Sequence, residues 1–283
     1  MAHRFLTTGF IVAVGVIVAV TGGAIVSANH AWSSYHWART TTSFDLTVVN
    51  STTTDWDIYV SQAVGDWSQS DKLNMVEDPN GSVASKDRRQ CRAPSGQVRI
   101  CNFGYGPTGW LGIAGISIDT NGHIVQGYTK LNDTYFDTAY YDSPLWKQSV
   151  SCQELGHNIG LGHQDGNFNN QPLFSCMDYQ DPPYEYPNAH DLDQLDTIYG
   201  HLDAYDSYAG AAPPADGGGS GDGGCNAPPG KGCNKAGVGQ SNAENGWGIS
   251  IGRDGVYERF MRIDADGTRH ITHVRWVDDG AGR

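Results

Sequence analysis

SCQELGHNIGLGH, residues 151–163, is the part of this chain that says most about its architecture. The pattern indicates a helix that is closed by a glycine-rich turn. Side chains four residues apart share one face of a helix, so Gln153 and His157 can both reach a single metal ion. Glycine adopts positive φ readily, so Gly160 can turn the chain out of the helix and bring His163 back toward the same ion.

This spacing resembles the zinc-binding consensus of the metzincin metallopeptidases, H-E-x-x-H-x-x-G-x-x-H. Glu154, His157, Gly160 and His163 match it, whereas Gln153 stands where the consensus has its first histidine. In this family the glutamate is the general base that acts on the metal-bound water. The resemblance therefore implies Zn2+ as cofactor, with Gln153, His157 and His163 as its ligands and Glu154 as a catalytic residue.

A second motif follows downstream, where Ser175, Met177 and Tyr179 spell S-x-M-x-Y. It resembles the Met-turn that lies beneath the metal in metzincins, with Met177 as the structural methionine. The resemblance implies that Tyr179 reaches the metal or stabilises the transition state. The fold class implied by both motifs is α+β, a metzincin-like domain with a twisted mixed sheet, long helices and a Met-turn.

Hydrophobic patterns elsewhere agree with such a domain. Residues 44–49 and 123–132 predict strands, residues 56–67 predict a long helix, and Asn188 is a candidate N-cap for a last helix. In the resembled family, the strand before the ligand helix is an edge that pairs with bound peptide. We expect either this role or that of an ordinary sheet strand for residues 111–116.

The first 28 residues read as a secretory signal peptide, with a basic start, an apolar run and small residues at Val26-Ser27-Ala28. We expect cleavage after Ala28 and a secreted, extracellular protein. The alternative is an uncleaved N-terminal helix that anchors the protein, because the apolar stretch is nearly long enough to span a membrane.

The chain has 6 cysteines, which in an exported protein suggests three disulfides. Proximity in sequence favours Cys91–Cys101 and Cys225–Cys233. Cys152 and Cys176 remain, and a bridge between them would tie the ligand helix to the S-x-M-x-Y turn.

The catalytic domain is expected to cover residues 29–203. A linker rich in Gly, Pro and Asp follows at residues 204–224, and residues 225–283 form a small β-rich region whose role the sequence does not reveal.

The formal net charge of −13 argues against nucleic acid as a partner and, once the signal peptide is removed, against stable membrane association. We expect a monomer that acts on protein or peptide substrates. Asp165, Asn167 and Asn169 have the spacing of the first half of a calcium loop. The rest of that motif is missing, so a solvated loop is the prediction and Ca2+ binding is the alternative.

Gln153 separates two functional hypotheses. An amide oxygen is a weaker zinc ligand than an imidazole nitrogen. The first hypothesis is a secreted zinc-dependent endopeptidase in which Glu154 activates water. The second is a catalytically inactive binding module on the metzincin fold. The sequence predicts surface or structural roles for His36 and His123, and structural roles for His190 and His201.

Overall fold

The computed structural model describes residues 29–208 and 246–277. The predicted signal peptide and the Cys225–Cys233 pair lie outside these residues. Within them are five helices and nine strands. In chain order they are β1 (His36–Trp37), β2 (Phe44–Asn50), α1 (Asp57–Trp67), β3 (Leu73–Asp78), α2 (Ser85–Gln90), β4 (Val98–Phe103), β5 (Trp110–Ile118), β6 (His123–Asn132), α3 (Asp133–Phe136), α4 (Pro144–Asn158), α5 (Ala189–Ile198), β7 (Ile249–Asp254), β8 (Tyr257–Ile263) and β9 (Arg269–Trp276).

One mixed sheet contains all nine of these strands. Eight of them follow the order β3-β2-β4-β6-β5-β9-β8-β7, and β1 pairs with the start of β6. The strands from β3 to β6 are parallel. From β6 onward, β5, β9, β8 and β7 pair antiparallel. This arrangement is the mixed sheet that the sequence predicted.

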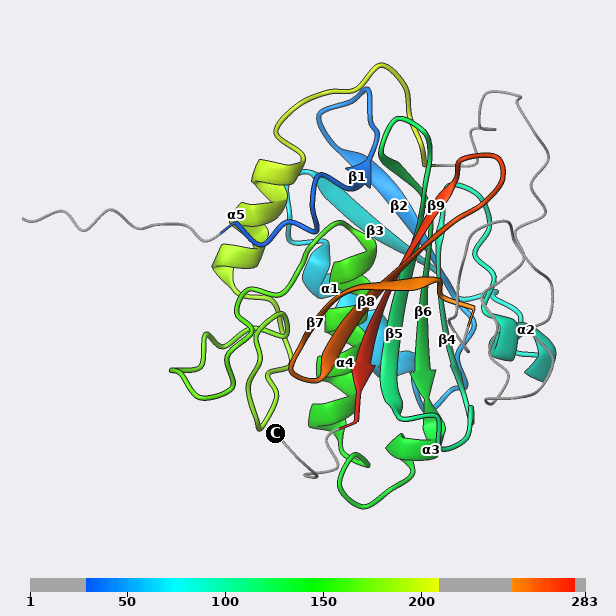
Figure 1. The fold of residues 1–283 in the computed structure, drawn as a ribbon, viewed down its shortest axis with the longest axis vertical. Coiled ribbons are helices and arrows are strands. Elements are labelled where there is room, and N and C mark those ends of the chain that lie inside the picture. The colour runs from blue at the N-terminus through cyan, green and yellow to red at the C-terminus, as the bar shows by residue number, and fades with distance from the viewer. Residues whose placement is uncertain (1–28, 209–245, 278–283) are drawn as a thin grey trace, which may run out of the picture.

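The C-terminal strands are part of this sheet. β9 pairs along β5 from Trp110 to Ile118, and the strands coloured orange to red in Figure 1 continue the sheet from there. The domain boundaries predicted from the sequence stay predictions, but the sheet itself is continuous between residues 29–203 and the β-rich region near the C-terminus. Residues 111–116, for which the sequence left open a substrate-binding edge or an ordinary sheet strand, therefore lie in an interior strand.

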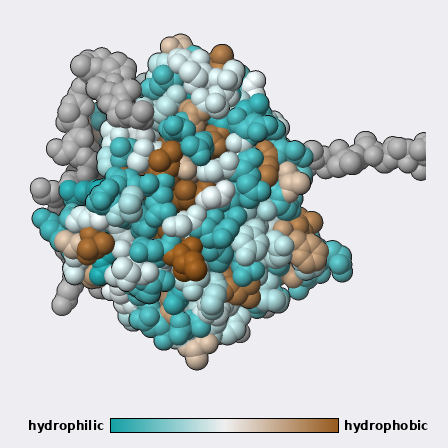
Figure 2. Space-filling view, turned by 180° about the vertical axis from the view of Figure 1, so that it is seen from behind, coloured by the Kyte–Doolittle hydropathy of each residue, from teal (hydrophilic) through white to brown (hydrophobic). Residues whose placement is uncertain are grey.

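The helices α1 and α4 pack against each other and against the sheet. Trp67 of α1 shows how closely, because its indole N–H donates to the Cys152 carbonyl of α4 at 2.9 Å. Burial of large aromatic and aliphatic side chains between helices and sheet supplies most of the driving force for this packing. In the view of Figure 2, hydrophobic residues on the rear face form small separate spots among hydrophilic ones.

Two disulfides join the described cysteines, Cys91–Cys101 and Cys152–Cys176. The second one links α4 to the turn that contains Met177, as the sequence suggested. Disulfides are typical of proteins exposed to an oxidising compartment. Among the described residues, no helix is both long enough and apolar enough to span a membrane.

Candidate metal centre

Helix α4 positions the first residues of the site. It begins where the Ser143 hydroxyl accepts from the Trp146 N–H at 3.3 Å, with Pro144 in the first turn. Its C-terminal half is buried, and the relative exposure of Glu154 and of His157 is 0%. The Leu161 carbonyl lies 2.8 Å from Nδ1 of His157. Because a carbonyl only accepts, Nδ1 carries the proton and Nε2 keeps its lone pair for a metal.

A turn at Gly160 brings His163 beside His157. Gly160 has φ +98°, and a Cβ at this position would lie 2.3 Å from the Tyr35 carbonyl oxygen. Only glycine fits both the backbone angle and the space. The ring centroids of His157 and His163 are consequently 4.8 Å apart. This is the geometry that the spacing of the two histidines predicted.

The S-x-M-x-Y segment lies against the same histidines. The Tyr179 hydroxyl is 2.6 Å from Nδ1 of His163, and Met177 is fully buried beside Gly156 of α4. A hydrogen bond from a ring nitrogen to a neighbouring group orients a metal-binding imidazole. In this structure Tyr179 thus contacts a histidine, and its role in catalysis stays a prediction, as does the assignment of a Met-turn.

The side-chain amide of Gln153 is hydrogen-bonded to other residues of the protein. Its amide nitrogen donates to the Cys176 carbonyl and to the Tyr257 hydroxyl, both at 3.0 Å. Its amide oxygen accepts from Nη1 of Arg275, also at 3.0 Å. A guanidinium that already holds this oxygen opposes the approach of a second cation. This geometry does not support the zinc-ligand role that the sequence assigned to Gln153.

A third histidine comes from the C-terminal strand β9. The ring of His273 lies 4.0 Å from that of His157 and 4.6 Å from that of His163, measured between centroids. One possible ligand atom from each of these three histidines lies within 4.8 Å of the other two. Sequence reasoning missed His273. Its surroundings carry no metal-binding motif, and only the pairing of β9 with β5 places it here.

Glu154 lies one helical turn before His157 on α4 and is fully buried. Neither of its carboxylate oxygens has a hydrogen-bond partner. Burial raises the pKa of Glu154 to about 8, and the charge of Arg275 opposes that shift. A Cβ at Gly112 of β5 would be 2.7 Å from Oε1 of Glu154, so the small residue on β5 makes room for the carboxylate.

The three histidines are held neutral. Burial, above all, lowers the pKa of His157 to about 4 and lowers those of His163 and His273 well below the ordinary value. Neutral imidazole is the form that binds metals. The buried Nε2 atoms of His157 and His163 and the buried Nδ1 of His273 have no hydrogen-bond partner. Three unpartnered imidazole nitrogens fit a catalytic zinc, which usually takes three protein ligands.

Residues 165–170, which include the calcium-loop spacing, are held by hydrogen bonds among themselves. Oδ1 of Asp165 accepts from the Asn167 N–H at 2.8 Å, and Oδ2 accepts from the Asn170 side chain. The side chain of Asn167 in turn accepts from the Asn169 N–H. These are the local bonds of a polar turn, and Ca2+ binding stays the alternative to the predicted solvated loop.

Comparisons with known proteins give distant similarities of fold. No protein-family profile matches the chain, and no curated protein matches its sequence. Among solved structures, one similar chain is high choriolytic enzyme 1 (HCE-1), a hatching-enzyme zinc protease from Oryzias latipes, the medaka fish. The match has a TM-score of 0.35 and 11% identity, and covers 58% of this chain and 94% of that chain.

Proposed function

We propose that this protein is a secreted zinc-dependent endopeptidase of the metzincin type. The observation that supports it most is the convergence of His157, His163 and His273. The buried Glu154, whose oxygens have no hydrogen-bond partner, lies one helical turn before His157 on α4. In this proposal His273 takes the ligand place that the sequence assigned to Gln153. When bound, zinc supplies Lewis-acid chemistry that activates water and polarises a carbonyl group.

Glu154 performs the proton transfers in this proposal. Its carboxylate takes a proton from the attacking water and delivers it to the nitrogen of the leaving amine, which breaks the peptide bond. Tyr179 holds His163 through Nδ1 and so fixes the ring that faces the metal. Arg275, beside Gln153, adds positive charge near the site, which favours the anionic form of Glu154.

The test combines metal analysis with hydrolysis by the full-length, oxidised protein without an affinity tag. We expect zinc in the protein and cleavage of casein that stops with a chelator and returns with zinc. Glu154→Gln should retain zinc and lose at least about a hundredfold in activity, because the general base is removed. Glu185→Gln, the same substitution in the loop before α5, is the control. Undiminished cleavage by Glu154→Gln would refute this general base.

A second candidate is the inactive binding module on the same fold. It is favoured by the pairing of β9 with β5, which occupies the strand for which peptide binding was one of the two roles left open. The complete burial of Glu154 points the same way. A protein that holds zinc at these three histidines but cleaves no peptide would support this candidate against the endopeptidase.

A further inference from the structure

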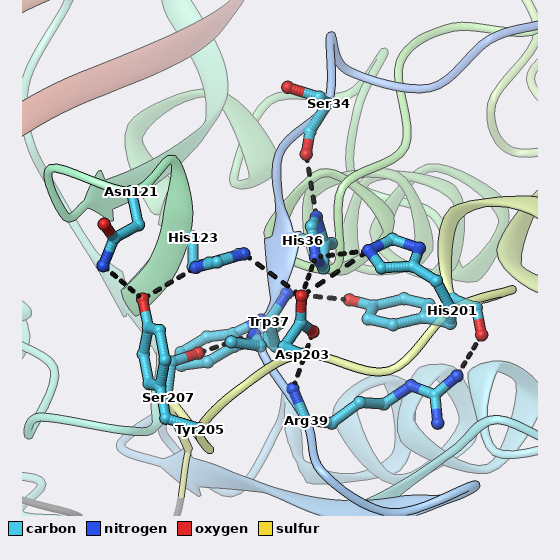
Figure 3. Close-up of polar contacts among 12 residues, drawn as sticks. Ser34, His36, Trp37, Arg39, Asn121, His123, His201, Asp203, Tyr205 and Ser207 are labelled. Carbon is cyan, nitrogen blue, oxygen red and sulfur yellow. Dashed lines mark hydrogen bonds and ion pairs between the residues drawn. The ribbon is translucent and has the colours of Figure 1, made fainter.

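Three histidines and an aspartate form a second cluster elsewhere in the fold. His36 lies in β1, His123 begins β6, and His201 and Asp203 follow α5. Figure 3 shows the three imidazoles pointing at the carboxylate of Asp203 from different sides. None of these residues belongs to the candidate metal centre of α4 and β9, and the sequence predicted surface or structural roles for the histidines.

The distances within the cluster match those between the ligands of a tetrahedral zinc ion. Oδ1 of Asp203 lies 3.4 Å from Nε2 of His36 and 3.6 Å from Nε2 of His201. The two Nε2 atoms are 3.2 Å apart. Ligands about 2.05 Å from a tetrahedral zinc are separated by about 3.4 Å. An ion therefore fits among the three atoms without rearrangement of the backbone.

The hydrogen bond of His36 shows which ring nitrogen is free. Its Nδ1 lies 2.8 Å from the Ser34 carbonyl oxygen, which can only accept. Nδ1 therefore carries the proton of the neutral ring, and Nε2 directs a lone pair at a carboxylate oxygen and at another imidazole nitrogen. Lone pairs that face each other at these distances repel unless a proton or a metal ion lies between them.

His123 has the same arrangement on the other side of the carboxylate. Its Nδ1 lies 2.7 Å from the Tyr205 hydroxyl, and that hydroxyl donates its only proton to Asp119. Nδ1 of His123 must then be the donor to the tyrosine oxygen. Its Nε2 faces Oδ1 of Asp203 at 3.3 Å and is a further donor within reach of an ion.

Asp203 is fixed by the backbone of Arg39. Oδ2 accepts from the Arg39 N–H at 2.9 Å, and the Asp203 N–H donates to the Arg39 carbonyl at 2.8 Å. These two bonds leave Oδ1 directed at the histidines. Hydrogen-bonded neighbours of this kind commonly orient metal-ligating carboxylates.

We propose that His36, His201 and Asp203 bind a second divalent cation, with His123 beside them as a further donor. Two or three imidazoles and one carboxylate are a donor set that suits zinc. The ion would join β1, the start of β6 and the segment after α5, which are far apart in the chain. Its role is structural, because the cluster lies outside the group of residues that the proposed hydrolysis uses.

The experiment is a zinc titration of the untagged, chelator-stripped protein against a chromophoric chelator, with Co2+ absorption spectra as a second readout. His201 is the residue to change, because its side chain is 55% exposed and its loss leaves the core intact. His190→Ala, which removes a histidine from α5, is the matched control. His273→Ala reports separately on the centre used by the proposed function.

We expect two bound zinc ions in the wild type and in His190→Ala. His201→Ala should bind one ion tightly and the second at least about tenfold more weakly, with a corresponding loss in the Co2+ spectrum. Casein cleavage by zinc-loaded His201→Ala should stay at the wild-type level. His273→Ala should retain the second ion even if the proposed hydrolase activity is never found, so the two proposals can fail independently.

The proposal is overturned if His201→Ala binds zinc with the stoichiometry and affinities of the wild type. It is equally overturned if the wild type binds only the ion that His273→Ala removes, because the cluster is then held together by protons and not by a metal.

Discussion

At the scale of single residues, the candidate metal centre contains His273 in the place where the sequence predicted Gln153. Gln153 lies one helical turn before His157 and could have faced the same ion. Its amide is instead bonded to Arg275, Tyr257 and the Cys176 carbonyl. Each of those bonds is buried, so the amide cannot turn toward a metal without leaving a buried partner unsatisfied.

The presence of His273 in place of Gln153 at the metal centre predicts different outcomes for two alanine variants. Gln153→Ala should leave zinc affinity within about threefold of the wild type, and should lose about 1–3 kcal/mol of stability because the Arg275 guanidinium loses its acceptor. His273→Ala should weaken zinc binding at the α4 centre at least about tenfold. Zinc titration and urea unfolding measure the two effects, and His270→Ala on the same strand is the control. The reverse ranking of zinc affinities would restore Gln153 as the ligand.

Lys130 gives a prediction about pH. Its side chain is buried in β6, with its ammonium over the rings of Tyr105 and Tyr128. Burial, followed by the charge of Arg92, lowers the pKa of Lys130 to about 7 in the folded protein, from 10.5. The charged form is thus disfavoured in the fold. The free-energy cost of burying the charged ammonium is therefore fully present below pH 7. It disappears as the pH rises to 10.5, the pKa of the lysine in the unfolded chain.

Lys130→Met should therefore be more stable than the wild type at pH 6, by an amount on the order of 4 kcal/mol. The difference should shrink steadily between pH 7 and pH 10. Urea unfolding of both proteins across this range measures it, and comparison at each pH cancels the other titrating groups. A difference that does not change with pH would contradict a depressed pKa at this lysine.

At the scale of elements, α4 is the part on which both proposals for the α4 centre depend. Its buried face carries Glu154 and His157, and the Cys152–Cys176 disulfide ties it to the turn of Met177. The sequence was sufficient to predict this much, because the ligand spacing, the glycine turn and the cysteine pair all lie within residues 151–179. Short-range geometry of a helix and its turn follows from local residue types.

The two disulfides allow a matched test of this element. Chain-entropy arguments assign about 3 kcal/mol of stability to each, since their loops differ little on a logarithmic scale. The double variant Cys152→Ala/Cys176→Ala should weaken zinc binding at the α4 centre, whereas Cys91→Ala/Cys101→Ala should lose similar stability and keep its zinc affinity. Zinc titration of both variants at a temperature where both are folded decides this. Equal zinc affinities in the two variants would show that the Cys152–Cys176 disulfide does not contribute to metal binding at the α4 centre.

At the scale of the whole molecule, the C-terminal hairpin of β8 and β9 completes the sheet against which α4 packs. It brings His273, Arg275 and Tyr257 to the residues of α4, and it adds strands to a sheet that would otherwise end at β5. Apolar residues from both parts, among them Ile113 of β5 and Val274 of β9, share one buried cluster. The hairpin is therefore stabilised by burial as well as by strand pairing.

A chain that ends at residue 245 should show the consequences of losing this hairpin. It should bind zinc weakly at the α4 centre because His273 is missing, and keep the zinc ion bound by His36, His201 and Asp203. Without β9, one edge of the apolar strand β5 is unpaired. Because such an edge pairs readily with other chains, we also expect the truncated protein to form oligomers. Size-exclusion chromatography at several concentrations, combined with metal analysis, measures both effects. A monomer with two tightly bound zinc ions would contradict this account of the hairpin.

The sequence alone determined what depends on neighbours along the chain: the ligand helix with Glu154 and His157, the return of His163 through Gly160, and the two short-range disulfides. Only the tertiary structure decided which residue is the third imidazole and where the amide of Gln153 points. It also brought His36, His123 and His201 around Asp203. The physical reason is that these contacts depend on strand register and chain crossing, which join residues from distant parts of the chain and leave no periodic signal in the sequence.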